Sequence, residues 1–165
     1  MTSRLAYIIL LAGSLVWCAL IVLAPLSSSV SPTLSHYFYD FFSHICHQDD
    51  ARSLHIGGAK FGVCIRCSAI YLAFFVSVLV FPLLRGRIHL DSRAVWVIAV
   101  APMVIDVLCD AVGIHSSTTT TRLLTGGLFG FSAAQLIVPV AVQAFMDVCR
   151  ALTHTRGRVY ESQTG

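Results

Sequence analysis

The chain has 165 residues, of which 56% are hydrophobic and only 12% carry a charge. Soluble domains carry about 25% charged residues, so the composition excludes a freely soluble globular protein, and it excludes disorder, collagen and coiled coil as well. The net charge of +3 comes from 11 lysines and arginines spread along the chain without a run of like charges, so nothing indicates a nucleic-acid partner. The apolar residues gather in long runs, and we expect the lipid bilayer to surround them.

Four apolar runs are long enough, at about 1.5 Å of helical rise per residue, to cross a hydrocarbon core roughly 30 Å thick. They cover residues 5–24, 68–84, 94–114 and 123–146. The first run also resembles a signal peptide, but apolar signal cores usually span about 7–15 residues, so we expect this longer run to stay in the mature protein. The sequence therefore predicts an all-α membrane protein with four transmembrane helices in one domain, residues 1–165.

The arginines predict how these spans are oriented, because short cytoplasmic loops retain lysine and arginine. Most basic residues fall at the N-terminus, in the loop 85–93 and in the tail 149–165, which lie on one side if the spans alternate. The others belong to the long segment 25–67 and the short loop 115–122. We expect both termini in the cytoplasm, segment 25–67 outside the cell, and the protein in a bacterial inner membrane.

The outer segment contains a signal for the start of a helix. Ser31 can cap a helix with its hydroxyl group, and Pro32 then occupies the first helical position. Apolar residues recur after it at helical spacing, at Leu34, Phe38, Phe41, Phe42 and Ile45. The pattern predicts an amphipathic helix that lies at the outer membrane interface, followed by a Cys/His-rich outer loop.

This outer loop holds the densest group of potential metal ligands. Cys46 and His47 are adjacent, and Cys64 and Cys67 follow immediately before the second span. Two thiolates with two residues between them can bind one tetrahedral ion, and a Cys/His pair returned by the loop can complete the site. The spacing predicts a Cys3His zinc site, with His44 as the alternative to His47.

Two other interpretations of the cysteines stay open, because the outer face of a bacterial membrane is oxidising. One is an inert disulfide, although three outer cysteines leave one thiol unpaired. The other is a thiol-disulfide oxidoreductase in which Cys64 and Cys67 exchange, Cys46 is the resolving thiol, and Arg66 lowers a thiol pKa.

The third span contains two carboxylates, Asp106 and Asp110, four residues apart and therefore on one helix face. A carboxylate near the bilayer centre costs at least about 2.5–3.5 kcal/mol, so both must face protein, water or a cation unless they lie near the outer interface. Arg122, which opens the fourth span, can anchor the helix, neutralise Asp110, or bind a phosphate or carboxylate. We predict a catalytic pocket of these three residues that acts on a lipid-phosphate-like or other amphiphilic substrate.

Small residues repeat at every fourth position of the last run, at Gly126, Gly130 and Ala134. Such stripes let transmembrane helices approach closely. The stripe predicts packing inside the chain, or a contact surface of a homo-oligomer if the protein is a non-catalytic transport or assembly subunit.

Several of these motifs occur together in one known family. The sequence resembles a family of small prokaryotic membrane proteins that is catalogued as domain of unknown function 2085. The resemblance covers roughly residues 41–130. It rests on Cys46-His47-Gln48, Val63 to Tyr71 with its Cys64-Ile-Arg-Cys67, Asp106, and Ser117 to Arg122 followed by Thr125-Gly126. The family implies a membrane protein and supports this choice of residues, but it implies no activity.

Overall fold

The computed structural model describes residues 3–84, 93–114 and 116–163, and most of them are helical. Its elements, in chain order, are α1 (Ser3–Ser27), α2 (Pro32–Ser43), the 3-10 turn η1 (Asp50–Arg52), β1 (Ser53–Ile56), β2 (Ala59–Cys64), α3 (Ile65–Leu84), α4 (Arg93–Val112) and α5 (Thr119–Gln163). The predicted helical runs all lie in helices, with ends that differ from the prediction by a few residues, except that α5 continues well beyond residue 146.

Three of the helices are long and apolar enough to cross a membrane: α1, α3 and the part of α5 from Thr119 to Ala151. The third predicted run forms the 20-residue helix α4, which is not among these three within the described part of the chain. The fourth span therefore stays a prediction. The basic loop that sets the predicted orientation, residues 85–92, lies outside the described residues.

The predicted helix in the outer segment is confirmed as α2. The Ser31 side chain accepts a hydrogen bond from the backbone N–H of Leu34 at 3.4 Å, and Pro32 occupies the first helical position. The helix packs against the end of α1, where the Ser35 hydroxyl donates to the carbonyl of Ala24 at 2.8 Å. On the same side, the fully buried ring of Phe42 meets Trp17 edge-on, with centroids 5.7 Å apart. These contacts fix the chain segment that leads to Cys46.

The all-α prediction is wrong for residues 53–64, which form an antiparallel hairpin of β1 and β2. Its turn is Gly57-Gly58, and both glycines have positive φ angles, 59° and 82°. Such two-residue turns match the twist of paired strands and favour glycine at both positions. The hairpin packs on α1 and α2 through Gly62, where an added Cβ atom would lie 2.8 Å from the Phe42 ring. Strand β2 therefore leads directly into α3 at a fixed place.

Helices α3 and α5 approach each other closely along the stripe of small residues. A Cβ atom on Gly130 would lie 2.1 Å from the carbonyl oxygen of Ile70, and Ala134 is fully buried beside Val78 and Val138. The stripe is therefore used inside the chain, and it does not supply the exposed oligomer contact that the sequence offered as an alternative. Oligomerisation itself stays an untested prediction.

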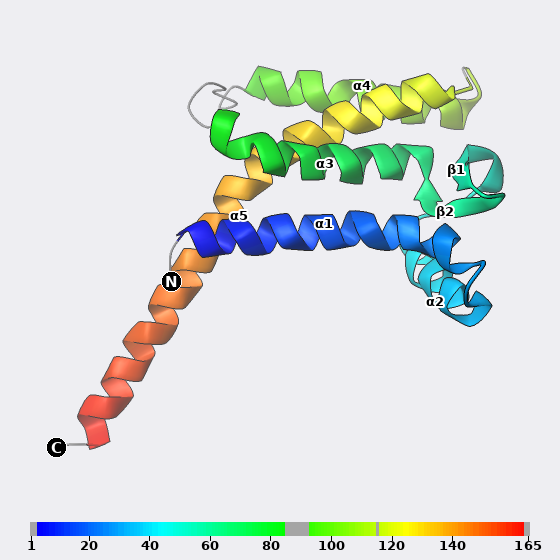
Figure 1. Cartoon of the computed structure of the whole chain (residues 1–165). Helices are drawn as coiled ribbons and strands as arrows, with labels where there is room; N and C mark the ends of the chain where they lie inside the picture. The colour runs from blue at the N-terminus through cyan, green and yellow to red at the C-terminus, as the bar shows by residue number, and fades with distance from the viewer. Residues whose placement is uncertain (1–2, 85–92, 115, 164–165) are drawn as a thin grey trace.

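The elements divide the molecule into two ends (Figure 1). The β1–β2 hairpin, α2 and the turn from α4 into α5 lie together at one end, which we call the hairpin end. The N-terminus lies at the other end, and the far half of α5 extends past it. This arrangement gathers segment 25–67 and the α4–α5 turn on the same side of the helices, so their polar side chains can meet.

Candidate metal centre and arginine–aspartate cluster

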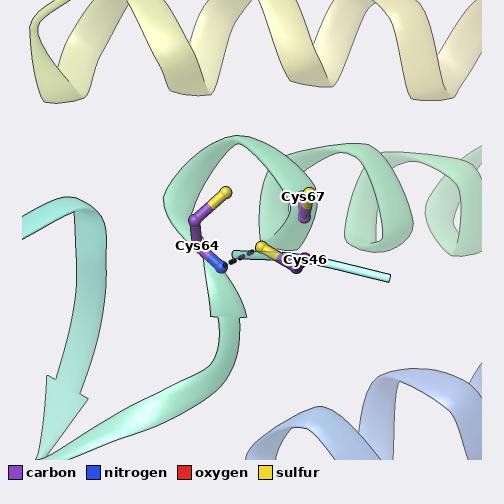
Figure 2. Close-up of side chains that lie close together, drawn as sticks. All are labelled: Cys46, Cys64 and Cys67. Carbon is purple, nitrogen blue, oxygen red and sulfur yellow. Dashed lines mark hydrogen bonds between the residues drawn. The ribbon is translucent and has the colours of Figure 1, made fainter. Parts of the chain in front are cut away.

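Three cysteine side chains converge at the hairpin end, and we call them the thiol cluster: Cys46, Cys64 and Cys67. Their sulfur atoms all lie within 4.8 Å of one another, and Cys46 is buried (Figure 2). They come from three segments: the loop after α2, the last residue of β2 and the first turn of α3. None of the three is in a disulfide. The strand-to-helix junction explains why Cys64 and Cys67, with two residues between them, can face the same point.

The loop that carries Cys46 is fixed by Gln48. This residue has a φ of 50°, in the left-handed region that few residues other than glycine adopt. Its side-chain amide donates to the carbonyl of Tyr39 at 2.7 Å, and its own carbonyl accepts from Lys60 Nζ at 2.8 Å. These two bonds tie the end of α2 to the hairpin, so the glutamine of the Cys-His-Gln motif has a positioning role that the sequence did not reveal.

Hydrogen bonds within the thiol cluster favour the thiolate form of Cys46. The Cys64 thiol, followed by the Cys67 thiol, holds the pKa of Cys46 well below its usual range. The backbone N–H of Cys64 also donates to Cys46 Sγ at 3.3 Å. Because the thiolate is both the metal ligand and the nucleophile, Cys46 is prepared for either chemistry.

The histidines do not join the three cysteines. His47 is exposed and lies outside the group of ligand atoms. His44 is exposed too, and its Nδ1 lies 2.9 Å from the carbonyl oxygen of Asp40. The structure thus brings together three of the four predicted ligands.

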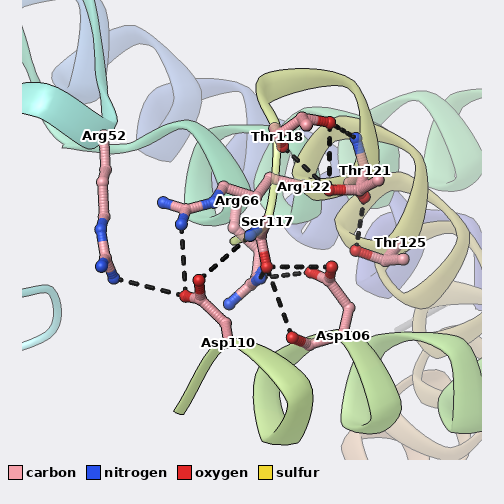
Figure 3. Close-up of polar contacts among 9 residues, drawn as sticks. All are labelled: Arg52, Arg66, Asp106, Asp110, Ser117, Thr118, Thr121, Arg122 and Thr125. Atoms are coloured by element: carbon pink, nitrogen blue, oxygen red, sulfur yellow. Dashed lines mark hydrogen bonds and ion pairs between the residues drawn. The ribbon is translucent and has the colours of Figure 1, made fainter. Parts of the chain in front are cut away.

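A second group of polar side chains lies at the same end, and we call it the arginine–aspartate cluster: Arg52, Arg66, Asp106, Asp110, Ser117 and Arg122 (Figure 3). Asp106 pairs with Arg66 and also accepts a hydrogen bond from the Ser117 hydroxyl at 3.0 Å. The two predicted pocket carboxylates therefore face protein, each with an arginine beside it.

Asp110 is surrounded by donors on several sides. Arg122 lies 3.2 Å from its Oδ2 and Arg52 lies 3.5 Å from the same atom, while the backbone N–H of Ser117 donates to Oδ1 at 3.1 Å. The contact with Arg122 agrees with the counter-ion role expected from the sequence. Arg52 belongs to η1, and its contact with Asp110 links the segment before the hairpin to α4.

Apart from Arg52, which is half exposed, the charged side chains of the cluster are largely buried, and the cluster carries more positive than negative charge. The side chains of Asp106 and Arg122 are only 8% and 10% exposed, and three guanidinium groups face two carboxylates. Two guanidinium nitrogens, Nε of Arg66 and Nε of Arg122, are buried without a hydrogen-bond partner among the described residues. A buried donor left unpaired costs about 1–3 kcal/mol, and more when it is charged, so the cluster has spare capacity for an anionic acceptor.

Sequence reasoning found Asp106, Asp110 and Arg122, and placed Ser117 in a loop that could line the same site, but it missed the roles of Arg52 and Arg66 in this cluster. A signal was present, because two carboxylates in an apolar helix need cations on the same side of the membrane. Besides Lys60, the basic residues of segments 25–67 and 115–122 are Arg52, Arg66 and Arg122. Arg66 also lies between Cys64 and Cys67, so one short turn of backbone serves both clusters.

The apolar helices and the polar groups gathered at one end define an integral membrane protein. Residues 46–136 match the family described as Predicted membrane protein (DUF2085), and the chain belongs to this family. The matched region begins at Cys46 and contains every residue of both clusters. The resemblance predicted from the motifs is confirmed.

Two relatives come from archaea. An uncharacterized protein of Methanocaldococcus jannaschii is 31% identical over 142 residues, which cover 81% of this chain and 91% of the relative. An uncharacterized protein of Methanothermobacter thermautotrophicus is 30% identical over 95 residues, or 58% of this chain and 86% of the relative. No solved structure matches the chain. The bacterial inner membrane and the orientation of the termini therefore stay predictions.

Proposed function

We propose that this membrane protein binds a thiophilic metal ion, Zn²⁺, through Cys46, Cys64 and Cys67. The observation that carries the proposal is the convergence of three sulfur atoms within 4.8 Å of one another. Tetrahedral zinc sites hold thiolates about 2.3 Å from the ion, which places the sulfur atoms about 3.8 Å apart. The side chains therefore need only small movements to form three corners of such a site.

The surroundings of the thiol cluster support a metal more than an inert packing role. Cys46 is buried, and both neighbouring thiols and one backbone N–H favour its thiolate form. Three thiolates crowded together repel one another unless a cation lies between them, and Zn²⁺ supplies that charge.

The fourth coordination position decides what the metal can do. His47 follows Cys46 directly, and a turn of its exposed side chain toward the cluster would complete a closed, structural Cys3His site. A water molecule in the same position would instead be activated by the metal for hydrolysis. We propose His47 as the fourth ligand, because its neighbour in the chain is already part of the cluster.

In the same proposal, the arginine–aspartate cluster binds the phosphate group of an amphiphilic substrate. Asp106, Asp110 and Arg122 are the proposed catalytic residues. The support is the excess of guanidinium over carboxylate groups and the two buried Nε–H donors without an acceptor. A phosphate can accept from both guanidinium groups, and each carboxylate it displaces becomes available for proton transfer.

Elemental analysis of the full chain, purified in mild detergent, tests the metal site. We expect about one zinc per chain and three thiols that react with an alkylating reagent only after chelation. Cys64→Ser and Cys67→Ser should each lower the zinc content to a small fraction, whereas Cys109→Ser, outside the cluster, should leave it unchanged.

The same experiment separates the metal from the redox interpretation. A protein without metal in which Cys64 and Cys67 form a disulfide would overturn the zinc site and favour a thiol-disulfide oxidoreductase. In that case a Cys67→Ser variant should trap a mixed disulfide with a partner thiol, because the second thiol is needed to release it.

Binding of glycerol 3-phosphate, a soluble phosphate monoester without acyl chains, tests the anion pocket. Asp106→Asn keeps the shape of the side chain but removes the partner charge of Arg66. We expect this variant to stay inserted and zinc-loaded and to bind the probe at least tenfold more weakly. Arg122→Gln should abolish binding of this soluble probe, whereas Asp40→Asn, at an exposed acid outside the cluster, should not affect it. Unchanged binding in Arg122→Gln would exclude the pocket and leave the metal site untouched.

A further inference from the structure

A groove opens at the end of the bundle opposite to both clusters. It lies where α1, α3 and α5 meet, and its volume is about 600 Å³, within the roughly 300–1,000 Å³ of typical ligand pockets. The walls are mainly apolar and include Tyr7, Phe81, Val138, Val142 and Met146. The groove is separate from the thiol cluster and from the arginine–aspartate cluster, since none of their residues lines it.

The groove exists because α5 leaves the bundle. Val138 is fully buried against α3, but further along the helix diverges from α1 and α3 (Figure 1). Helix α1 is held in place across the gap by the Tyr7 hydroxyl, which donates to the carbonyl of Val78 at 2.8 Å. The space between the diverging helices is therefore a built feature of the fold.

Cationic side chains lie at the polar mouth of the groove. Arg4 comes from the first turn of α1, immediately before its apolar run, and Arg150 comes from α5 just beyond Met146. Asp147, 3.4 Å from Arg150, also lines the mouth. The two arginines and this aspartate give the mouth a net charge of +1. Charge therefore lies at the depth of lipid headgroups, and the apolar walls continue from there toward the hydrocarbon core.

We propose that this groove binds an anionic phospholipid, with the phosphate at Arg4 and Arg150 and an acyl chain along the apolar walls. Basic pockets between transmembrane helices recognise anionic headgroups in this way. The match between a cationic mouth and an apolar interior favours a lipid over a soluble anion, which would leave the walls unfilled, and over an apolar protein helix, which would bring no anion to a mouth of net charge +1. The site does not depend on the metal or on the function proposed above.

Lipid binding to the detergent-purified full chain tests the proposal, with phosphatidylglycerol and phosphatidylcholine as probes. We expect phosphatidylglycerol to remain bound in native mass spectra and to raise the melting temperature, and phosphatidylcholine to do neither. Each arginine near a phosphate contributes about a 5-fold gain in affinity, so Arg4→Gln/Arg150→Gln should weaken phosphatidylglycerol binding about 30-fold. Both side chains are exposed, so the melting temperature without lipid should not change.

Two further variants distinguish a shaped site from general attraction to a positive surface. Val142→Trp fills the groove without changing its charge and should reduce phosphatidylglycerol binding. Lys60→Gln removes one positive charge at the hairpin end and should leave binding unchanged. Equal binding of the two lipids, or an equal loss in Lys60→Gln and in the double arginine variant, would overturn the proposal.

Discussion

The two clusters at the hairpin end differ in how completely the protein satisfies them. In the arginine–aspartate cluster every carboxylate has an arginine within ion-pair distance, and only two Nε–H groups lack a partner among the described residues. In the thiol cluster three sulfur atoms face one another with hydrogen bonds but no opposite charge. The first cluster can therefore hold the fold without a ligand, whereas the second has no cation among its own side chains and would gain most from the ion proposed above.

This difference shows that burial alone does not identify a ligand site. Most side chains of both clusters are shielded from solvent. The arginine–aspartate cluster has more hydrogen-bond donors than acceptors, whereas the thiol cluster has sulfur lone pairs and no cation. An anion would complete the arginine–aspartate cluster, and a cation would complete the thiol cluster. Their shared element is the turn from Cys64 to Cys67, which carries Arg66.

The largest expected effect comes from breaking the buried ion pair of Arg66 and Asp106. Arg66→Met leaves the Asp106 carboxylate uncompensated at 8% exposure, so we expect a loss of about 3–5 kcal/mol in the free energy of unfolding in detergent. Because this cluster needs no metal, the loss should be the same before and after chelation.

A double variant provides the control for that prediction. Arg66→Met/Asp106→Leu removes both charges and should recover most of the lost stability, since a buried pair often contributes no more than apolar residues of similar volume. Asp147→Ala disrupts an exposed pair and should change stability by less than about 1 kcal/mol. If Arg66→Met also releases zinc, the two clusters form one unit and the contrast between them is wrong.

A smaller effect is expected from Gly126→Ala, which acts on the shared turn. The new Cβ atom would lie 2.8 Å from the Arg66 carbonyl oxygen, so α3 must shift where it carries Arg66 and Cys67. Overpacking of this kind costs about 1–3 kcal/mol, and the shift should also weaken zinc retention against a chelator.

The neighbouring glycine supplies a matched control. A Cβ atom on Gly127 would meet nothing nearer than the Ala73 Cβ at 4.0 Å. Because alanine favours a helix by about 1 kcal/mol over glycine, Gly127→Ala should be neutral or stabilising. Equal zinc loss in both variants would show that the effect does not pass through Arg66.

The smallest effect is expected at Arg52, whose side chain is 52% exposed and lies 3.5 Å from Asp110. Solvent-exposed ion pairs contribute about 0–1 kcal/mol, so Arg52→Gln should lower the free energy of unfolding only slightly, and less at high salt. Arg122→Gln removes the better-buried partner of the same carboxylate and should cost several-fold more. Equal losses would mean that Arg52 is an integral part of the cluster.

The parts of the fold that the sequence predicted are those determined by local patterns. The α2 helix follows from Ser31 and Pro32 and from apolar spacing, all within a few residues. The hairpin was missed although Gly57-Gly58 is a hairpin signal, because its strands are short and lie in a segment interpreted as a polar loop. The length of α5 was missed because its polar continuation carries no membrane signal.

The same reasoning separates the predicted from the unpredicted parts of the site. Cys64 and Cys67 are close in sequence, so their convergence was predictable, whereas His47 is exposed in a loop whose path, with a left-handed residue at Gln48, no sequence pattern indicated. The pairing of Arg66 with Asp106 joins residues 40 positions apart. Such a contact depends on how helices are arranged, which no local pattern encodes.

The 45 residues of α5 have a consequence beyond binding. At about 1.5 Å per residue the helix is roughly 68 Å long, more than twice the hydrocarbon thickness. Its beginning carries Arg122 of the arginine–aspartate cluster, and its contact with α3 ends near Val138. Pro139 lies directly after this point and removes one helical hydrogen bond, so α5 bends more easily there than elsewhere along its length.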